Sequence, residues 1–359
     1  ILSTTQGETS VVSTNTTTLS DAPSLSSDGK TVAYESIIGG TSQIFLRRES
    51  NPPVAITNGN GGSYAPAISA NGEYVVFHSY ASDLVVGDVN GLADAFLYDA
   101  LLNRITKISN SSTGSNADGG SFYPAINNNG SIIVFESLAS NLGSDPNLGI
   151  SDLFVYDVPS QTIQCITYPN TFGKGLSMGS FQSSISFDGK RVAYTSYSSN
   201  LISEGATDDQ NGFSDVFLWK ADNNKTSRIS RTSSVYQEVI GGASSEPAIS
   251  GDGKYVAFHS TGRGIVSITL DDSGAGHAIA PIVTITDSLG PGFGATAFST
   301  INVNGELTAI TLSNPGAGFI SPIVTIEQHP LDTGILARPA TATANLSHER
   351  GDVYLVNVD

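Results

Sequence analysis

The segment Pro247-Ala-Ile-Ser-Gly-Asp-Gly253, followed by the strand-like Tyr255-Val-Ala-Phe258, is one of five versions of a single pattern in this 359-residue chain. The five versions begin at Pro23, Pro66, Pro124, Ser183 and Pro247. Each has Asp-Gly or Asn-Gly at the same place and a short run of apolar and aromatic residues behind it. Internal self-similarity of this kind indicates a repeat architecture, in which each unit buries its apolar faces against its neighbours.

Each unit predicts a small antiparallel sheet. Asp-Gly and Asn-Gly accept the positive φ of a two-residue hairpin turn, so the first two strands of a unit are expected to fold back on each other. A third strand, such as Asp215-Val-Phe-Leu218, and a fourth, such as Thr226-Ser-Arg-Ile-Ser230, follow in the same order. Four antiparallel strands repeated radially are the layout of a propeller blade. The sequence therefore predicts an all-β chain with a β-propeller of about five four-stranded blades.

The fifth unit lacks a fourth strand, because its third strand is followed almost at once by Asp359. Residues 8–14, Glu-Thr-Ser-Val-Val-Ser-Thr, precede the first unit and match the fourth-strand pattern. We expect Val11 and Val12 to pair with the edge Val353–Val358, since an unpaired edge is an aggregation hazard. If the strand comes from the same chain, the ring closes as a monomer. If it comes from a neighbour, the contact propagates head to tail into a filament.

A second repeat interrupts the fifth unit. Val266-Ser-Ile-Thr-Leu270 recurs as Thr308-Ala-Ile-Thr-Leu312, and Pro281-Ile-Val-Thr-Ile285 recurs as Pro322-Ile-Val-Thr-Ile326. The alternation of apolar residues predicts a duplicated all-β module. The expected divisions are an N-terminal strand and linker at 1–20, the blades at 21–262, the inserted module at 263–348 and the closing strand of the last blade at 349–359.

The pattern Pro-Ala-Ile-Ser-x-Asp-Gly-x-x-Val-Ala-Phe-x-Ser, followed by Asp-Val-Phe-Leu, resembles the TolB-like and WD40-like (PD40) propeller repeats. The resemblance covers roughly residues 8–262 and 350–359. It implies a scaffold for binding and assembly more than any particular reaction. The inserted module is similar, more loosely, to glycine-rich β modules of phage tail and bacterial surface proteins.

An acidic loop precedes the third strand in two of the units. Its polar residues are Asp88, Asn90 and Asp94 in the second unit and Asp209, Asn211 and Asp215 in the fourth. Oxygen ligands at alternate positions around a glycine turn can wrap a hard cation, so Ca²⁺ is the candidate cofactor of these loops. The loops lack the third early ligand and the final Glu of an EF-hand. Asp and Asn also cap turns through backbone hydrogen bonds, which is the favoured interpretation.

Each second strand carries one polar residue directly after its aromatic residue. These residues are Glu35, His78, Glu136, Thr195 and His259. One such residue per blade could form a metal-binding ring, but second strands lie away from a propeller axis and would hold the ligands too far apart. Separate hydrogen-bonding roles are therefore expected.

The composition excludes several classes of function. Lys and Arg number 16 against 33 Asp and Glu, and the net charge of −17 repels the phosphates of nucleic acids. No run approaches the roughly 18 apolar residues of a membrane helix. No nucleophile elbow, zinc spacing or phosphate loop occurs. Cys165, the single cysteine, lies in a strand-like segment where a buried apolar role is expected.

The sequence thus predicts a protein without catalytic residues, nucleic-acid partner or membrane span. We expect an extracellular or cell-surface protein of a bacterium or phage, with a structural or adhesive role and self-assembly through the N-terminal strand. The alternative is a propeller that binds glycans or cleaves polysaccharides.

Overall fold

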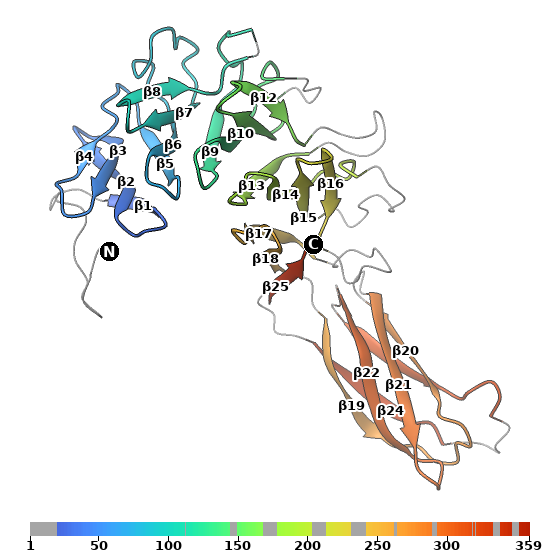
Figure 1. Ribbon diagram of the computed structural model, residues 1–359. Coiled ribbons are helices and arrows are strands. Elements are labelled where there is room, and N and C mark those ends of the chain that lie inside the picture. The colour runs from blue at the N-terminus through green and yellow to red at the C-terminus, as the bar shows by residue number, and fades with distance from the viewer. Residues whose placement is uncertain are drawn as a thin grey trace.

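The computed structural model describes residues 20–111, 113–143, 149–167, 178–202, 213–230, 242–261, 264–288, 293–317, 319, 321–332, 338–346 and 352–359. These residues form 25 strands and no helix, so the predicted all-β fold is confirmed (Figure 1). No helix in the described part of the chain is therefore long and apolar enough to cross a membrane. The predicted strand at residues 8–14 lies outside the described residues.

Five antiparallel sheets, which we number blades 1–5, follow one another along the chain. Blade 1 contains β1 (Ser20–Leu25), β2 (Thr31–Ile38), β3 (Thr41–Arg48) and β4 (Val54–Ala55), and blade 2 contains β5 (Ser63–Ile68), β6 (Tyr74–Ser79), β7 (Asp94–Asp99) and β8 (Arg104–Lys107). Blade 3 contains β9 (Ser121–Ile126), β10 (Ile132–Ser137), β11 (Asp152–Asp157) and β12 (Thr162–Cys165), and blade 4 contains β13 (Ser180–Ile185), β14 (Arg191–Ser196), β15 (Asp215–Lys220) and β16 (Lys225–Arg228). Blade 5 has three strands, β17 (Ser244–Ile249), β18 (Tyr255–Ser260) and β25 (Asp352–Asn357). Figure 1 shows the blades along an open arc, with blade 1 in blue at one end and β25 in red at the other.

The loops between the first two strands of each blade differ from the two-residue turns predicted. In blade 1 the Ser26 N–H donates to the Thr31 carbonyl at 2.9 Å, so the hairpin encloses four residues. Gly29 has a φ of 71°, the left-handed conformation that the Asp-Gly pair predicted. Asp28 accepts hydrogen bonds from the Ser26 hydroxyl at 2.6 Å and from the Lys30 N–H at 3.0 Å. These side-chain bonds stabilise the longer loop.

A β-bulge in the first strand of each blade is the main fold feature that the sequence analysis missed. In blade 2 the pairing with β6 shifts between Tyr64 and Ala67. Ala65 lies inside the shift with a φ of 51°, which is uncommon for a residue with a side chain. The equivalent residues Ala22, Tyr123, Gln182 and Glu246 have φ values of 46°, 47°, 57° and 55°. Proline follows the bulge residue in four of the five blades, and proline inside a strand is a sign of a bulge.

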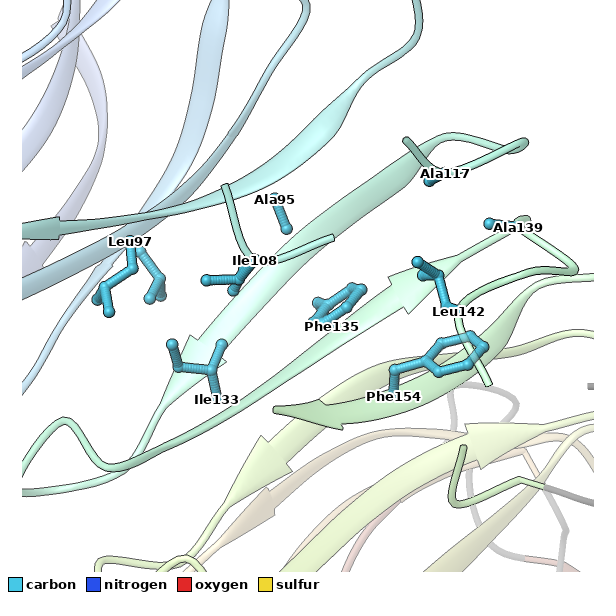
Figure 2. Close-up of a cluster of buried hydrophobic side chains, with 10 residues drawn as sticks. Ala95, Leu97, Ile108, Ala117, Ile133, Phe135, Ala139, Leu142 and Phe154 are labelled. Carbon is cyan, nitrogen blue, oxygen red and sulfur yellow. The ribbon is translucent and has the colours of Figure 1, made fainter. Parts of the chain in front are cut away.

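The core consists of apolar faces packed between consecutive blades. Leu97 and Ile108 of blade 2 share one buried cluster with Ile133 and Phe135 of blade 3 (Figure 2). The neighbouring residue in β7, Phe96, is buried on the opposite face in the cluster with blade 1. Alternation along each strand therefore gives a blade one face for the preceding blade and one for the following blade.

The inserted module is a nested set of strand pairs between β18 and β25. The pairs are β19 (Ile265–Asp272) with β24 (Thr341–Leu346), β20 (Ile282–Asp287) with β23 (Pro322–Glu327), and β21 (Phe293–Ile301) with β22 (Leu307–Ala317). The first sequence repeat supplies β19, β20 and β21, and the second supplies β22, β23 and β24. Each strand therefore pairs with the other repeat, and the central pair joins the two equivalent Pro-Ile-Val-Thr-Ile segments. The duplication has produced a module with approximate two-fold symmetry.

His277 and Phe319 occupy equivalent places in the two halves of this module, and both side chains are buried. Neither ring nitrogen of His277 has a hydrogen-bond partner among the described residues. A buried polar group without a partner costs free energy that an apolar ring of similar shape does not. We expect His277→Phe to raise the free energy of unfolding of the module by about 1–2 kcal/mol, measured by thermal melting. The matched change Phe319→His should lower it. A lower melting midpoint for His277→Phe would contradict this account.

Candidate functional site

A polar residue of the second strand binds each blade to the next. The carboxylate of Glu35 in blade 1 accepts the N–H of the bulge residue Ala65 in blade 2 at 2.7 Å. Glu136 of blade 3 accepts the N–H of Gln182 in the same way at 2.9 Å, and His78 of blade 2 has the Tyr123 N–H at 3.5 Å from its Nδ1. In blade 4 the Thr195 hydroxyl donates to the Gln182 side chain, which accepts the Glu246 N–H at 3.2 Å. The predicted hydrogen-bonding role is thus confirmed for Glu35, His78, Glu136 and Thr195, and in blades 2–5 the bulge residue donates its N–H to the preceding blade.

Burial shifts the pKa of two of these residues in opposite directions. Desolvation raises the pKa of Glu136 from 4.5 to about 7, although the Gln182 N–H opposes the shift. Desolvation lowers the pKa of His78 from 6.5 to about 4. The folded protein therefore favours the neutral form of each residue.

These shifts predict opposite effects of pH on stability. Because the pKa of Glu136 is raised on folding, its contribution is complete below about pH 4.5 and is lost as the pH rises through 7. Because that of His78 is lowered, its contribution is present above about pH 6.5 and is lost as the pH falls towards 4. The free energy of unfolding of the parent protein should fall between pH 5 and pH 8, and in Glu136→Gln this fall should be smaller by about 2–3 kcal/mol. Urea denaturation at several pH values in this range measures the difference. His78→Gln should instead reduce the loss at acid pH. Unchanged pH profiles in both variants would refute the assignment.

A second repeated contact joins the hairpin loops of consecutive blades. The Ser27 N–H of blade 1 donates to the Ala70 carbonyl of blade 2 at 3.0 Å. The series continues from Ala70 to Asn128, from Asn128 to Phe187 and from Phe187 to Gly251, at 3.0, 3.2 and 2.9 Å. Four backbone hydrogen bonds thus follow the order of the blades and end at Gly251 in blade 5.

Within each complete blade, a buried hydroxyl binds the fourth strand to the third. In blade 2 the Ser109 hydroxyl donates to the Asp94 carboxylate at 2.6 Å and accepts the Ala95 N–H at 3.1 Å. The same pair of bonds is made by Thr167 with Asp152 and Leu153 N–H, and by Ser230 with Asp215 and Val216 N–H. In blade 1 the pair is Thr57 with Gln43, at 2.6 Å. We call this contact the hydroxyl–aspartate lock.

The predicted calcium ligands Asp88 and Asp94 do lie together, but around the ammonium group of Lys107. The Nζ atom is 3.0 Å from the Asp88 carboxylate, 2.7 Å from that of Asp94 and 2.7 Å from the Asn116 side-chain oxygen. Asn90 caps a turn instead, since its side-chain oxygen accepts the N–H two residues further along. A cation at this place would have to displace the ammonium group, and calcium binding stays a prediction.

Blade 4 has a similar arrangement at Asp215. The guanidinium of Arg228 lies 3.5 Å from its carboxylate, whereas the other predicted ligands, Asp209 and Asn211, lie outside the described residues. Lys107 and Arg228 each follow their aspartate by 13 residues, a shared spacing that could have identified both cations from the sequence. In blade 3 the same position holds Cys165. No group of three His, Cys, Asp or Glu side chains converges as a metal site among the residues described.

Blade 5 presents one half of the repeated blade-to-blade contact, and no blade follows it among the described residues. His259 occupies the position of Glu35 and Glu136. The third-strand residues that face a following blade are Val353 and Leu355, which are 78% and 70% exposed. Their equivalents in blade 4, Val216 and Leu218, are completely buried.

Blade 1 presents the other half of the contact at the opposite end of the arc. Its bulge N–H, on Ala22, donates to the neighbouring Asp21 carboxylate at 2.7 Å, and no blade precedes it among the described residues. Leu25 is exposed, although the equivalent Ile68 is buried. Phe45 is half-buried. Val32 and Tyr34 of blade 1 are equivalent to Val256 and Phe258, which pack against blade 4, and both are already buried. This end of the arc therefore presents less exposed apolar surface than blade 5 does.

A cluster of aromatic side chains lies between blades 2 and 3. The ring of His78 is within 5.3–5.7 Å, between centroids, of Tyr64, Phe122 and Tyr123. Tyr80 packs edge-on at 6.4 Å from His78. Tyr80 and Tyr123 are exposed, so the cluster presents two tyrosine rings to solvent over a buried histidine.

No family model and no curated protein matches this sequence. Among solved structures, the chain is similar to TolB from Acinetobacter baumannii, with 18% identity over 86% of this chain and 57% of that one and a TM-score of 0.41. It is also similar to a TolB protein from Agrobacterium tumefaciens, with 14% identity over 88% and 92% and a TM-score of 0.43. The β-propeller domain of the Trilobed protease from Pyrococcus furiosus matches at 12% identity over 68% and 64%, with a TM-score of 0.41. This chain thus spans 57% of the length of the Acinetobacter protein. At these identities and TM-scores the likeness adds nothing on function to the all-β architecture described above.

Proposed function

We propose that this protein is a non-enzymatic structural subunit of an extracellular or cell-surface filament, assembled head to tail from copies of this chain. The observation that carries the proposal is that each end of the arc presents part of the contact that joins consecutive blades. Blade 5 has His259, Val353 and Leu355, and blade 1 has the Ala22 N–H and Leu25. A related contact joins each pair of consecutive blades inside the chain, which supports the proposal.

A second copy is the occupant that fits this surface. Blade 1 and blade 5 of one chain lie at opposite ends of an open arc (Figure 1). A heterologous contact between unlike ends generates an open polymer unless the rotation between subunits closes a ring. Burial of Val353 and Leu355 would contribute about 1.5–3 kcal/mol each. The symmetric inserted module, which resembles modules of phage tail and bacterial surface proteins, would then recur at every subunit.

The proposal is tested by imaging the purified protein in negative stain while its mass is followed by light scattering over a range of concentrations. We expect linear assemblies whose length increases with concentration. A monomer at all concentrations would refute it.

The aromatic cluster favours a second candidate, glycan binding. Exposed tyrosine rings such as Tyr80 and Tyr123 can stack on sugar rings, and the acidic, polar surface leaves such faces accessible. Glycan-array binding that is lost in Tyr123→Ala would support an adhesive role, which is compatible with assembly. Cleavage of a polysaccharide by the isolated chain would instead favour an enzyme.

A further inference from the structure

The fourth strands of blades 2, 3 and 4 are followed by the same two residue types. An isoleucine, at positions 108, 166 and 229, is buried in the core, and the next residue is the hydroxyl donor of the lock. The donor hydroxyl is 2.6 Å from its aspartate in all three blades. A strand that carries an aliphatic residue followed by Ser or Thr can therefore be placed beside a third strand in only one register.

Blade 5 has an aspartate at the third-strand position of this lock. Asp352 pairs with Ser260 across β25 and β18, as Asp94 pairs with Ser79 across β7 and β6. The outer edge of β25 has no fourth strand among the described residues. Residues 8–13, Glu-Thr-Ser-Val-Val-Ser, supply the missing pattern, with Val12 in the isoleucine position and Ser13 in the hydroxyl position.

We infer that residues 8–13 of a second copy form the fourth strand of blade 5, in the register that gives Ser13 and Asp352 the positions that Ser109 and Asp94 have in blade 2. The choice of a second copy rests on the proposed function, whereas the register does not. In blade 2, Phe96 faces Lys107 and Tyr98 faces Ile105. The same register in blade 5 makes Val11 face Tyr354 and Thr9 face Val356.

The linker between the donated strand and β1 is so short that donation of the strand also brings blade 1 of the donor against blade 5 of the acceptor. Six residues, 14–19, separate Ser13 from Ser20 at the start of β1. Five residues, 58–62, are enough to connect Thr57, the lock residue of blade 1, to the start of β5. The donor strand therefore brings the Ala22 N–H and Leu25 of its own blade 1 to the exposed face of the accepting blade 5.

The register is tested by a disulfide between Thr9→Cys and Val356→Cys in a Cys165→Ser background. In blade 2 the Ile108 N–H donates to the Ala95 carbonyl, so Ala95 and Ile108 are a hydrogen-bonded pair. Because such pairs alternate with non-hydrogen-bonded ones, Tyr98 and Ile105 are a non-hydrogen-bonded pair, with side chains close enough for a disulfide. The predicted pair Thr9 and Val356 corresponds to it. The matched control combines Thr9→Cys with Leu355→Cys, which is one residue out of register on the opposite face.

After mild oxidation, denaturing electrophoresis without reductant should show a ladder at multiples of 37.2 kDa for the first variant and at least tenfold less cross-linking for the control. Filaments are imaged in the same samples. Filaments without a ladder, or with equal ladders in both variants, would overturn the register and leave the proposed function standing. A cross-linked monomer would confirm the register but overturn donation by a second copy. Absence of filaments together with absence of cross-links would remove both proposals.

Discussion

Replacement of Lys107 with methionine should lower the free energy of unfolding by about 3–5 kcal/mol. The ammonium group is almost completely buried between Asp88 and Asp94, whose side chains are at most 2% exposed. Removal of one partner of a buried ion pair leaves the other partner charged in a medium that solvates it poorly. Two carboxylates would be left without their cation here, whereas methionine fills nearly the same volume. Urea denaturation measures the loss.

Two further variants make this result specific. Lys30, whose ion pair with Glu49 is more than half exposed, should lose less than about 1 kcal/mol when replaced by methionine. Addition of Asp88→Asn to Lys107→Met should restore part of the lost stability, because one uncompensated charge is removed. A loss below 1 kcal/mol in Lys107→Met would show that the buried carboxylates do not need the ammonium group.

Replacement of Val353 with glutamate should abolish assembly, with an apparent dissociation constant at least about a hundredfold higher. In the proposed filament this side chain is as deeply buried as Val216 is in blade 4. The variant loses about 1.5–3 kcal/mol of apolar burial and also places an unpaired charge in the contact. Analytical ultracentrifugation and negative-stain imaging would detect dispersed subunits.

The matched control is Val303→Glu, since Val303 is fully exposed in the turn between β21 and β22. It should assemble normally. The dispersed Val353→Glu subunit should melt at the same temperature as the dispersed parent protein, because the Val353 side chain is mostly exposed in the described part of the single chain. A different result would contradict the proposal. If both the parent protein and Val353→Glu were monomeric, and the variant melted several degrees lower, Val353 would be buried by closure of the ring within one chain.

The sequence was sufficient to predict the blades because each carries several agreeing local signals. The Asp-Gly and Asn-Gly pairs, the alternation of apolar residues and the order of the strands all repeat, and consistency across levels is what specifies a fold. The same local rules did not predict features that depend on contacts between residues far apart in the sequence. Ala65 has a positive φ and donates its N–H to Glu35 of the preceding blade, a contact that no local propensity contains.

The candidate calcium site, which stays a prediction, shows the same limit of local sequence rules. The spacing of Asp88 and Asp94 correctly indicated that the carboxylates converge, but it contained no indication of their partner. Lys107 comes from the next strand, and its role is visible only when Asp215 and Arg228 are compared with it. The pairing of unlike halves in the inserted module was also hidden, because a duplicated sequence does not reveal whether strands pair within a repeat or between repeats.

The position of the inserted module has an evolutionary consequence. The chain leaves β18 at Ser260 and returns at Asp352, and these two residues are direct partners across the sheet. In blade 2 the equivalent partners Ser79 and Asp94 are joined by an ordinary loop. Because the two ends of the insertion are cross-strand partners, the blade imposes no requirement on the size or shape of the inserted module. The entropic cost of closing such a loop also grows only slowly with its length. Recombination at the Ser260–Asp352 pair can exchange one inserted module for another, so that the surface of the module can diversify while the propeller stays constant.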